Sequence, residues 1–269
     1  MLKFISLGSG SSGNCYYLFT ESDGLIIDVG IGVRALKKYF VDYGLSQSKI
    51  HHILLTHDHA DHVKSVGSLS SSYHLPVYAT ALTFSGINRN YSIRRKVDPI
   101  NSHQIENDKT IKLGDFVITP FHVPHDSLDC VGYHIECQGV VFCLLTDVGC
   151  ITEEIKNNIK DADFLVIEAN YDREMLLNGP YSQYLKQRIC SGTGHLSNDF
   201  CADAIGRYSS QKLRHVWLCH LSQENNHPEL ARKTIIDGLK KYEKIVGSDF
   251  ELTVLKRKSP TGIFTLVDE

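Results

Sequence analysis

The fold of this chain is decided by residues 54–62, which read Leu54-Leu55-Thr56-His57-Asp58-His59-Ala60-Asp61-His62. Four side chains in this stretch are potential metal ligands: His57, His59, Asp61 and His62. They follow an apolar run typical of the end of a buried strand, so we expect them in a loop at the edge of a sheet. Imidazole and carboxylate together favour zinc, manganese or iron over calcium, which takes oxygen ligands alone.

A histidine-rich loop can also arise from composition, because the chain contains 14 histidines. Four ligands placed directly after a buried strand are nevertheless far more specific than a lone His-X-His pair. His57 and His59 are two residues apart and can reach one ion from one side. Asp61 and His62, on the turn that follows, can reach a second ion nearby.

The bulk properties predict an ordinary globular protein. The chain has 269 residues, of which 42% are hydrophobic and 22% are charged, and no apolar run approaches the length of a membrane span. Residues 1–8 lead into turn residues and predict a first strand, not a signal peptide, so we expect a cytoplasmic protein without a membrane partner. The eight cysteines lack any C-X-X-C pair and are interpreted mainly as buried thiols.

The charge of the chain gives only weak evidence about its binding partners. The net charge of −3 counts against tight, nonspecific binding of nucleic acid. Local basic clusters occur at residues 94–96 and 256–258, and such clusters are more often solvated faces than phosphate-binding tracks. If both clusters flank the metal ligands, a polymeric substrate is favoured. If they face away from the metal ligands, a small substrate is favoured.

The order of the expected elements favours a single α/β domain over residues 1–269. Strand-rich segments are followed by helices in each half, as in two face-to-face sheets with helices outside, a four-layer αββα sandwich. The expected strands are 3–7, 15–19, 25–29, 52–55, 77–79, 110–113, 116–121, 131–137, 140–145, 164–167, 215–218, 251–255 and 262–266. The expected helices are 33–43, a short one from residue 60, 82–87, 153–160, 198–208 and 228–242.

Further candidate ligands follow other apolar strands. Asp147 comes after the strand 140–145, His125 after a strand and turn, and His220 after Val216-Trp217-Leu218-Cys219. Each alone is more simply a turn aspartate or a core histidine. The repeated placement of a polar residue after a buried strand favours a shared metal site, because two-metal hydrolysis needs a bridging carboxylate and a closing ligand on each ion.

Taken together, these motifs resemble the metallo-β-lactamase superfamily, and within it the ribonuclease Z and cyclic-phosphodiesterase branch and most closely the bacterial YycJ/WalJ group of predicted exonucleases. The resemblance extends over nearly the whole chain, and it implies the αββα fold. Its motifs are Gly8-Ser9-Gly10-Ser11-Ser12-Gly13-Asn14, residues 57–62, His125 to Gly132-Tyr133, Thr146-Asp147-Val148-Gly149, Glu168-Ala169-Asn170-Tyr171-Asp172, Gly194-His195-Leu196-Ser197-Asn198 and residues 220–226.

The resemblance also implies how two divalent ions, zinc, manganese or iron, would be bound. One ion would have the ligands His57, His59 and His125; the other would have Asp61, His62 and His220; and Asp147 would bridge them. His122 competes with His125, which is favoured by its distance from Gly132-Tyr133. Histidine at position 62 and histidine at position 59 favour a two-ion hydrolase over branches that lose one ion or carry iron for redox chemistry.

A second pair sharpens the reaction class. Glu168 and His195 resemble the glutamate and histidine that the ribonuclease Z branch pairs, and such a histidine can protonate a leaving alkoxide near neutral pH. The simpler alternative is that His195 caps the helix near Asn198 and that Glu168 binds local backbone. With Asp61 orienting a hydroxide, the pair predicts a phosphodiesterase acting on nucleic acid, DNA more than RNA, and most specifically a DNA exonuclease.

Two alternatives remain open. A small-molecule hydrolase of the same fold, such as a cyclic phosphodiesterase, lactonase or thioesterase, fits the acidic charge and the lack of a long basic insertion. A non-enzymatic protein that retained its metal loop is the other, and fewer than about two ions per chain would favour it.

Overall fold

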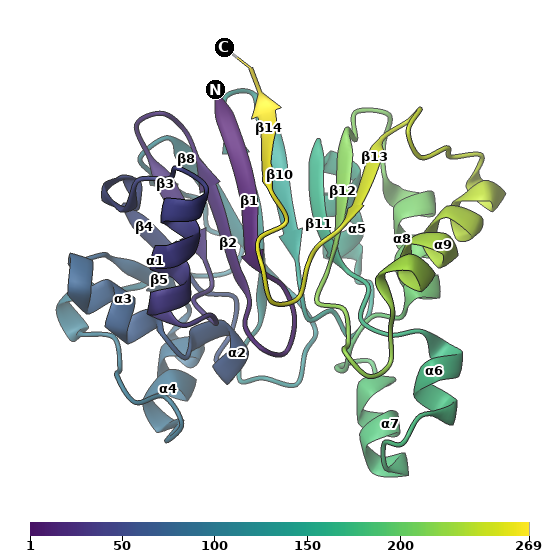
Figure 1. Ribbon diagram of the computed structural model, residues 1–269, viewed down its shortest axis with the longest axis horizontal. Helices are drawn as coiled ribbons and strands as arrows, with labels where there is room; N and C mark the ends of the chain where they lie inside the picture. Colours follow the sequence, from purple (N-terminus) through teal and green to yellow (C-terminus); the bar gives the residue numbers. More distant parts are fainter. Residues whose placement is uncertain (269) are drawn as a thin grey trace. The chain divides into compact units, whose positions relative to one another are not determined.

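In the computed structural model, which describes residues 1–268, the chain divides into two units (Figure 1). The first comprises residues 1–120, 127–131 and the C-terminal stretch from 256; the second comprises residues 121–126 and 132–255. The chain first passes from one unit to the other within β8 (Phe116–His122). The units are therefore not consecutive halves of the sequence, since the N- and C-terminal strands belong to the same unit.

The first unit contains a seven-stranded sheet in the order β14-β1-β2-β3-β4-β5-β6. Pairing is antiparallel from β14 to β3 and parallel from β3 to β6. Strands buried on both faces explain the uninterrupted apolar runs of this part of the sequence. The strands are β1 (Leu2–Gly8), β2 (Cys15–Phe19), β3 (Gly24–Ile27), β4 (His52–Leu54), β5 (Val77–Ala79), β6 (Ser102–Gln104) and β14 (Ile263–Val267).

Helices cover this sheet and complete its core. Leu36 and Phe40 of α1, Leu69 of α3 and Ile87 of α4 are buried in one hydrophobic cluster with strand residues such as Ile53. The helices are α1 (Val33–Asp42), α2 (Ala60–Val63), α3 (Val66–Tyr73) and α4 (Ala81–Arg89), with 3-10 turns at Gln47–Lys49 and Pro99–Asn101. The apolar face that the sequence predicted for residues 33–43 is thus the face that α1 buries.

A second seven-stranded sheet has the order β13-β12-β11-β10-β9-β8-β7. β10 pairs antiparallel with β9, and β10 to β13 are parallel neighbours. The remaining strands are β7 (Ile111–Leu113), β9 (Val131–Cys137), β10 (Val140–Leu145), β11 (Phe164–Glu168), β12 (His215–Cys219) and β13 (Glu251–Val254). Because β10, β11 and β12 are parallel, their carboxyl ends lie at one edge of the sheet.

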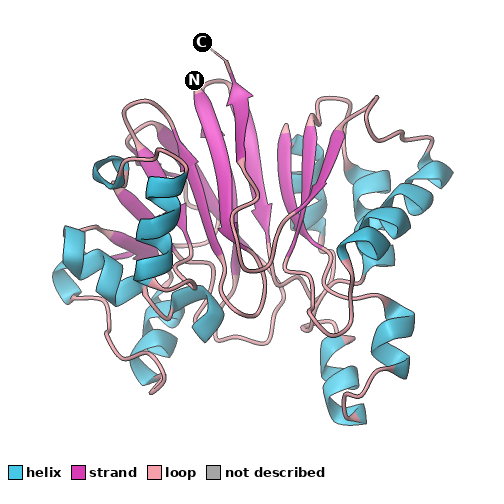
Figure 2. Cartoon of the chain, viewed as in Figure 1, coloured by secondary structure: helices cyan, strands magenta, loops and turns pink. Residues whose placement is uncertain are grey.

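The helices of the second unit begin at polar caps that the sequence makes visible. Thr152, Asp172, Ser182 and Ser197 each accept a hydrogen bond from the backbone N–H three residues later. These helices lie outside the strands, as the colours of Figure 2 show. They are α5 (Glu153–Asp161), α6 (Arg173–Asn178), α7 (Gln183–Ile189), α8 (Asn198–Tyr208) and α9 (Pro228–Leu239), followed by a 3-10 turn at Lys240–Tyr242.

Most expected elements are confirmed, and the differences have local causes. The sequence analysis missed α3, whose serine- and glycine-rich sequence has low helix propensity, and β6, a polar edge strand of three residues. It also missed the short helices α6 and α7. The helix expected to end at Tyr242 instead ends at Leu239 and tightens into a 3-10 turn. Within residues 1–268, no helix is long and apolar enough to cross a bilayer.

Candidate metal centre

The predicted metal loop connects β4 to α2 in the first unit. The ring centroid of His57 lies 4.6 Å from that of His59 and 4.1 Å from that of His62. His62 lies in the single turn of α2, with its Nε2 3.7 Å from Oδ2 of Asp61. His57 and His62 are fully buried, whereas the Asp61 side chain is about a quarter exposed. The loop therefore gathers the four residues expected from the sequence into one cluster.

The hydrogen bonds of the buried histidines define which nitrogen carries the lone pair. Asp28 accepts from Nδ1 of His62 at 2.7 Å and from Oγ1 of Thr56 at 2.8 Å. Because the Thr56 hydroxyl donates its one proton to Asp28, Nδ1 of His57 is the donor in its 3.0 Å bond to that hydroxyl. Both rings therefore carry the Nδ1 proton, and both present an Nε2 lone pair, the state in which imidazole binds a divalent metal.

Asn14 ties the glycine-rich loop after β1 to the metal loop. Its amide nitrogen donates to Nε2 of His62 at 2.9 Å and lies 3.3 Å from Oδ2 of Asp61. Its backbone N–H donates to the carbonyl of Asp61 at 2.7 Å, while its side-chain oxygen accepts from the N–H of Gly10. The donation to His62 independently assigns the lone pair of that ring to Nε2.

In the second unit, two candidate ligands follow strands and have a backbone conformation that few residues adopt. Asp147, just beyond β10, has a φ of 56°, and His220, just beyond β12, has a φ of 52°. Asp28, after β3 of the first unit, has a φ of 62°. Left-handed backbone at non-glycine residues is uncommon and clusters at functional sites. All three turns aim a buried polar side chain away from its strand.

Asp147, Glu168, His195 and His220 form a tight cluster in the second unit, with potential ligand atoms within 4.8 Å of one another. Oδ2 of Asp147 accepts from the Thr146 hydroxyl at 2.7 Å. Its other oxygen, Oδ1, lies 3.4 Å from Nδ1 of His220. One carboxylate oxygen of Asp147 is thus fixed by its neighbour, and the second faces the cluster.

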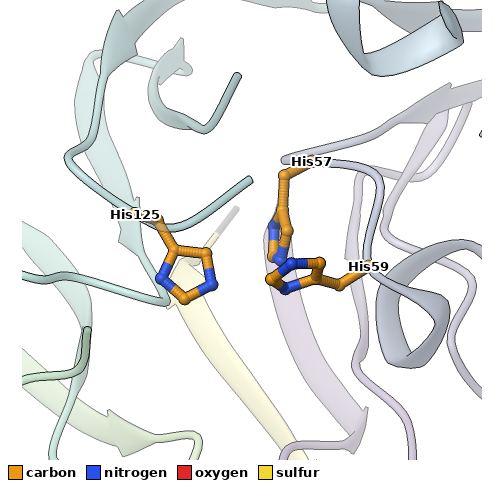
Figure 3. A group of neighbouring side chains, drawn as sticks. All are labelled: His57, His59 and His125. Atoms are coloured by element: carbon orange, nitrogen blue, oxygen red, sulfur yellow. The ribbon is translucent and has the colours of Figure 1, made fainter. Parts of the chain in front are cut away.

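The structure distinguishes His125 from His122, the two candidates for the third histidine ligand of the first ion. His125 is buried, and its Nδ1 donates to the carbonyl of Gly194 at 3.0 Å, so its Nε2 carries the lone pair. That Nε2 lies 3.7 Å from Oδ1 of Asp147. His122, at the end of β8, is exposed. Figure 3 shows the rings of His57 and His59 close together on one loop, with His125, from the second unit, also labelled.

Glu168 is fully buried and holds two histidines with one oxygen. Its Oε1 accepts from Nδ1 of His195 and from Nδ1 of His220, each at 2.9 Å. Its Oε2 accepts from the backbone N–H of Val148 and of Leu196. The alternative that Glu168 binds local backbone is therefore correct, but Glu168 also binds both histidines. His195 does not cap α8, because Ser197 is the capping residue.

Electrostatics in this pair favour a charged carboxylate and a basic imidazole. Burial raises the pKa of the Glu168 carboxyl, but attraction to His195 and hydrogen bonds from both histidines outweigh it, so the pKa is lowered. Burial lowers the pKa of His195, but the charge and hydrogen bond of Glu168 outweigh that effect and raise it. Glu168 is thus a positioning group: it accepts a hydrogen bond from Nδ1 of His195 and makes no hydrogen bond to Nε2 of that ring.

Sequence reasoning gave no role to Asp28, Thr56 or Asn170, although each contacts a candidate ligand or its partner. Asn170 donates to the carbonyl of His220 at 2.8 Å and lies 3.3 Å from Oε1 of Glu168. Asp28 carried the same signal as Asp147, a polar residue directly after an apolar strand. Thr56 and Asn170 had no such signal, because a small polar residue beside a ligand is common by chance.

The sequence matches one protein family, described as the beta-lactamase superfamily domain, over residues 25–220. Two relatives match over most of their length. Exodeoxyribonuclease WalJ of Streptococcus pneumoniae is 36% identical over 250 residues, 93% of each chain. Exodeoxyribonuclease YycJ of Bacillus anthracis is 34% identical over 262 residues, 97% of this chain and 98% of the relative.

A solved structure shows the same fold at low sequence identity. The metallo-β-lactamase fold protein YhfI of Bacillus subtilis superposes with a TM-score of 0.70, at 18% identity, over 96% of this chain and 98% of its own. The similarity confirms the four-layer αββα architecture expected from the sequence.

Proposed function

The chain belongs to the metallo-β-lactamase superfamily, and on that premise we propose that it is a two-metal phosphodiesterase that degrades DNA as an exonuclease. The observation that carries the reaction class is the Glu168–His195 pair beside Asp147. The relatives named exodeoxyribonucleases support DNA as the substrate over the small-molecule alternative. We place the activity in the cytoplasm, as expected from the sequence.

The two units are proposed to act as one catalytic domain, because neither holds a complete ligand set. The first ion would be bound by His57, His59 and His125. The second would be bound by Asp61, His62 and His220, with Asp147 bridging both. The donor set fits divalent zinc, manganese or iron: His57, His62 and His125 each donate from Nδ1 and present the Nε2 lone pair.

When bound, the two ions would supply a nucleophilic hydroxide and offset charge on the phosphoryl oxygens. The protein positions the histidine rings and the carboxylates that would surround these ions. Asp28 and Thr56 fix the rings of the first unit, and the partly exposed Asp61 would accept a hydrogen bond from the attacking oxygen. The carboxylate of Asp147 would hold the ions at a fixed separation.

His195 is proposed as the general acid. With Nδ1 held by Glu168 at 2.9 Å, the ring can only donate from Nε2, and it is about a fifth exposed, as a group that meets substrate must be. Phosphodiester cleavage releases an alkoxide of high pKa, so a positioned proton donor accelerates the step. A lactonase or thioesterase has less need of such a donor.

The test is cleavage of end-labelled duplex DNA, single-stranded DNA and RNA by purified protein with manganese. We expect progressive shortening of DNA from one end, and loss of that activity in Asp61→Ala. Asp98→Ala, which removes an exposed aspartate before the 3-10 turn at Pro99–Asn101, is a control for general damage. No cleavage of DNA by the wild type, or equal cleavage by Asp61→Ala, would contradict the proposal.

A further inference from the structure

The glycine-rich loop between β1 and β2 lies between two sources of positive charge within the first unit. The backbone N–H of Ser9 donates to the carbonyls of Lys256 and Arg257, at 3.1 and 3.2 Å. These bonds place the segment before β14 against one side of the loop (Figure 1). On the other side, Nζ of Lys64 donates to the carbonyl of Ser12 at 2.6 Å.

This loop leads directly into the metal half-site. Asn14, its last residue, donates to His62 and lies against Asp61, and Lys64 follows His62 by two residues. The charged surface is therefore continuous with the ligands of one candidate ion. The hydroxyl-bearing residues Ser11 and Ser12, at the tip of the loop, are exposed between the two sources of charge.

Lys258 follows Lys256 by two residues, and its carbonyl accepts from the Tyr39 hydroxyl of α1 at 3.0 Å. Lys64, Lys256 and Lys258 are exposed and have no carboxylate ion pair among the residues that the structure describes. Elsewhere, exposed cations commonly neutralise acids: Lys233 and Lys240 both pair with Asp237, and Lys241 pairs with Asp203. Unneutralised lysines beside a site for a phosphodiester are available for further phosphates.

The second basic cluster is different. Nζ of Lys96 donates to the carbonyls of Ile87 and Asn90, both at 2.6 Å, and Arg95 donates to Ser71. These bonds join the segment after α4 to the helices of the same unit. Lys96 is half-buried and makes two such bonds, whereas Lys64 is exposed and makes one, so Lys96 is the more structural of the two cations.

We propose that Lys64, Lys256 and Lys258, arranged about the loop Gly8–Gly13, bind phosphates of a nucleic-acid strand that flank the cleaved bond. The proposal rests on the phosphodiesterase function and extends it to a polymeric substrate bound through its backbone. Contacts of this type are independent of base sequence and weaken with salt. The surface would hold the strand while the metal site acts on the bond beside it.

The experiment compares the holoenzyme with Lys256→Ala/Lys258→Ala on labelled single-stranded DNA and on bis(p-nitrophenyl) phosphate. We expect KM for DNA to rise roughly tenfold, and the slope of log(kcat/KM) against log salt to fall by about 1.4, near 0.7 for each lost phosphate contact. Turnover of the small diester should not change. Lys256→Arg/Lys258→Arg should restore KM.

The matched control is Lys109→Ala/Lys112→Ala, which removes the same charge from exposed positions at β7 of the same unit. An unchanged KM and salt slope for DNA in Lys256→Ala/Lys258→Ala, or an equal rise in the control, would overturn the phosphate-binding surface. A wild type that cleaves the small diester but no polymer would instead overturn the nuclease function itself.

Discussion

Three polar residues of the candidate site have left-handed backbone although they are not glycine: Asp28, Asp147 and His220. Such conformations cost of order 1 kcal/mol or more each, and persist where surrounding contacts fix them. Asp28 accepts hydrogen bonds from Thr56 N–H, Thr56 Oγ1 and His62, and His220 is held by Glu168 and Asn170. The sequence pattern locates such residues, but their backbone conformation is visible only in the structure.

Asp28 should control metal affinity without touching a metal. In Asp28→Asn, the amide cannot accept both Thr56 donors and the His62 N–H, so the His62 ring loses its fixed orientation. We expect metal to bind about 10- to 100-fold more weakly, measured by competition with a chromogenic chelator. Asp115→Asn, a surface carboxylate that accepts from Thr20 and Ser22, should leave affinity unchanged. Equal affinities for both variants would show that Asp28 has no such role.

The role of His195 depends on the leaving group. His195→Ala should lower kcat on DNA by about 10²- to 10⁴-fold, because the alkoxide needs a proton. It should have little effect on bis(p-nitrophenyl) phosphate, whose leaving group is stable as an anion. His122→Ala, which removes an exposed histidine of β8, is the control. A similar loss on both substrates would assign His195 to metal binding or folding.

Segments of chain are joined at the metal loop by close backbone contacts. The N–H of Val29 donates to the carbonyl of His62, and the N–H of Gly30 donates to the carbonyl of Asn14. A Cβ added at Gly30 would lie 1.6 Å from the carbonyl oxygen of Asp61. Glycine is needed at position 30 because two segments cross there, which the sequence pattern did not indicate.

Gly30→Ala should therefore displace the metal loop. We expect a loss of roughly 3 kcal/mol in the free energy of unfolding and weaker metal binding, because backbone atoms must move to admit the methyl group. Gly32→Ala is the matched control, since a Cβ there meets nothing within 4 Å. Chemical denaturation of both variants checks the prediction, and equal stabilities would refute the packing argument.

His215 at the start of β12 makes stability depend on pH. Its ring stacks on Trp217 at 4.0 Å, and burial lowers its pKa from 6.5 to about 4. Between these values the unfolded chain binds a proton that the folded chain does not, so stability is lost as pH falls from 6.5 towards 4. In urea titrations, the free energy of unfolding of the wild type should therefore fall relative to that of His215→Gln between pH 7.5 and pH 5. A constant difference would contradict this.

The molecule as a whole was largely predictable, for a physical reason. Strands buried on both faces leave uninterrupted apolar runs, so the strands could be predicted. The candidate ligands His57, Asp147 and His220 could be located because each follows such a run, but the roles of Asp147 and His220 came from the resemblance. The short polar helices α6 and α7 and the supporting groups Thr56 and Asn170 could not be predicted, because tertiary contacts, and not local pattern, define them.

The central claim is that the proposed ligands bind two metal ions per chain. The most direct test counts the metal ions bound per chain by native mass spectrometry, in the wild type, His62→Ala and His125→Ala, one ligand from each unit. The account predicts two ions in the wild type and one fewer in each variant. A wild type with a single ion, or a His125→Ala variant that keeps the full number, would contradict it.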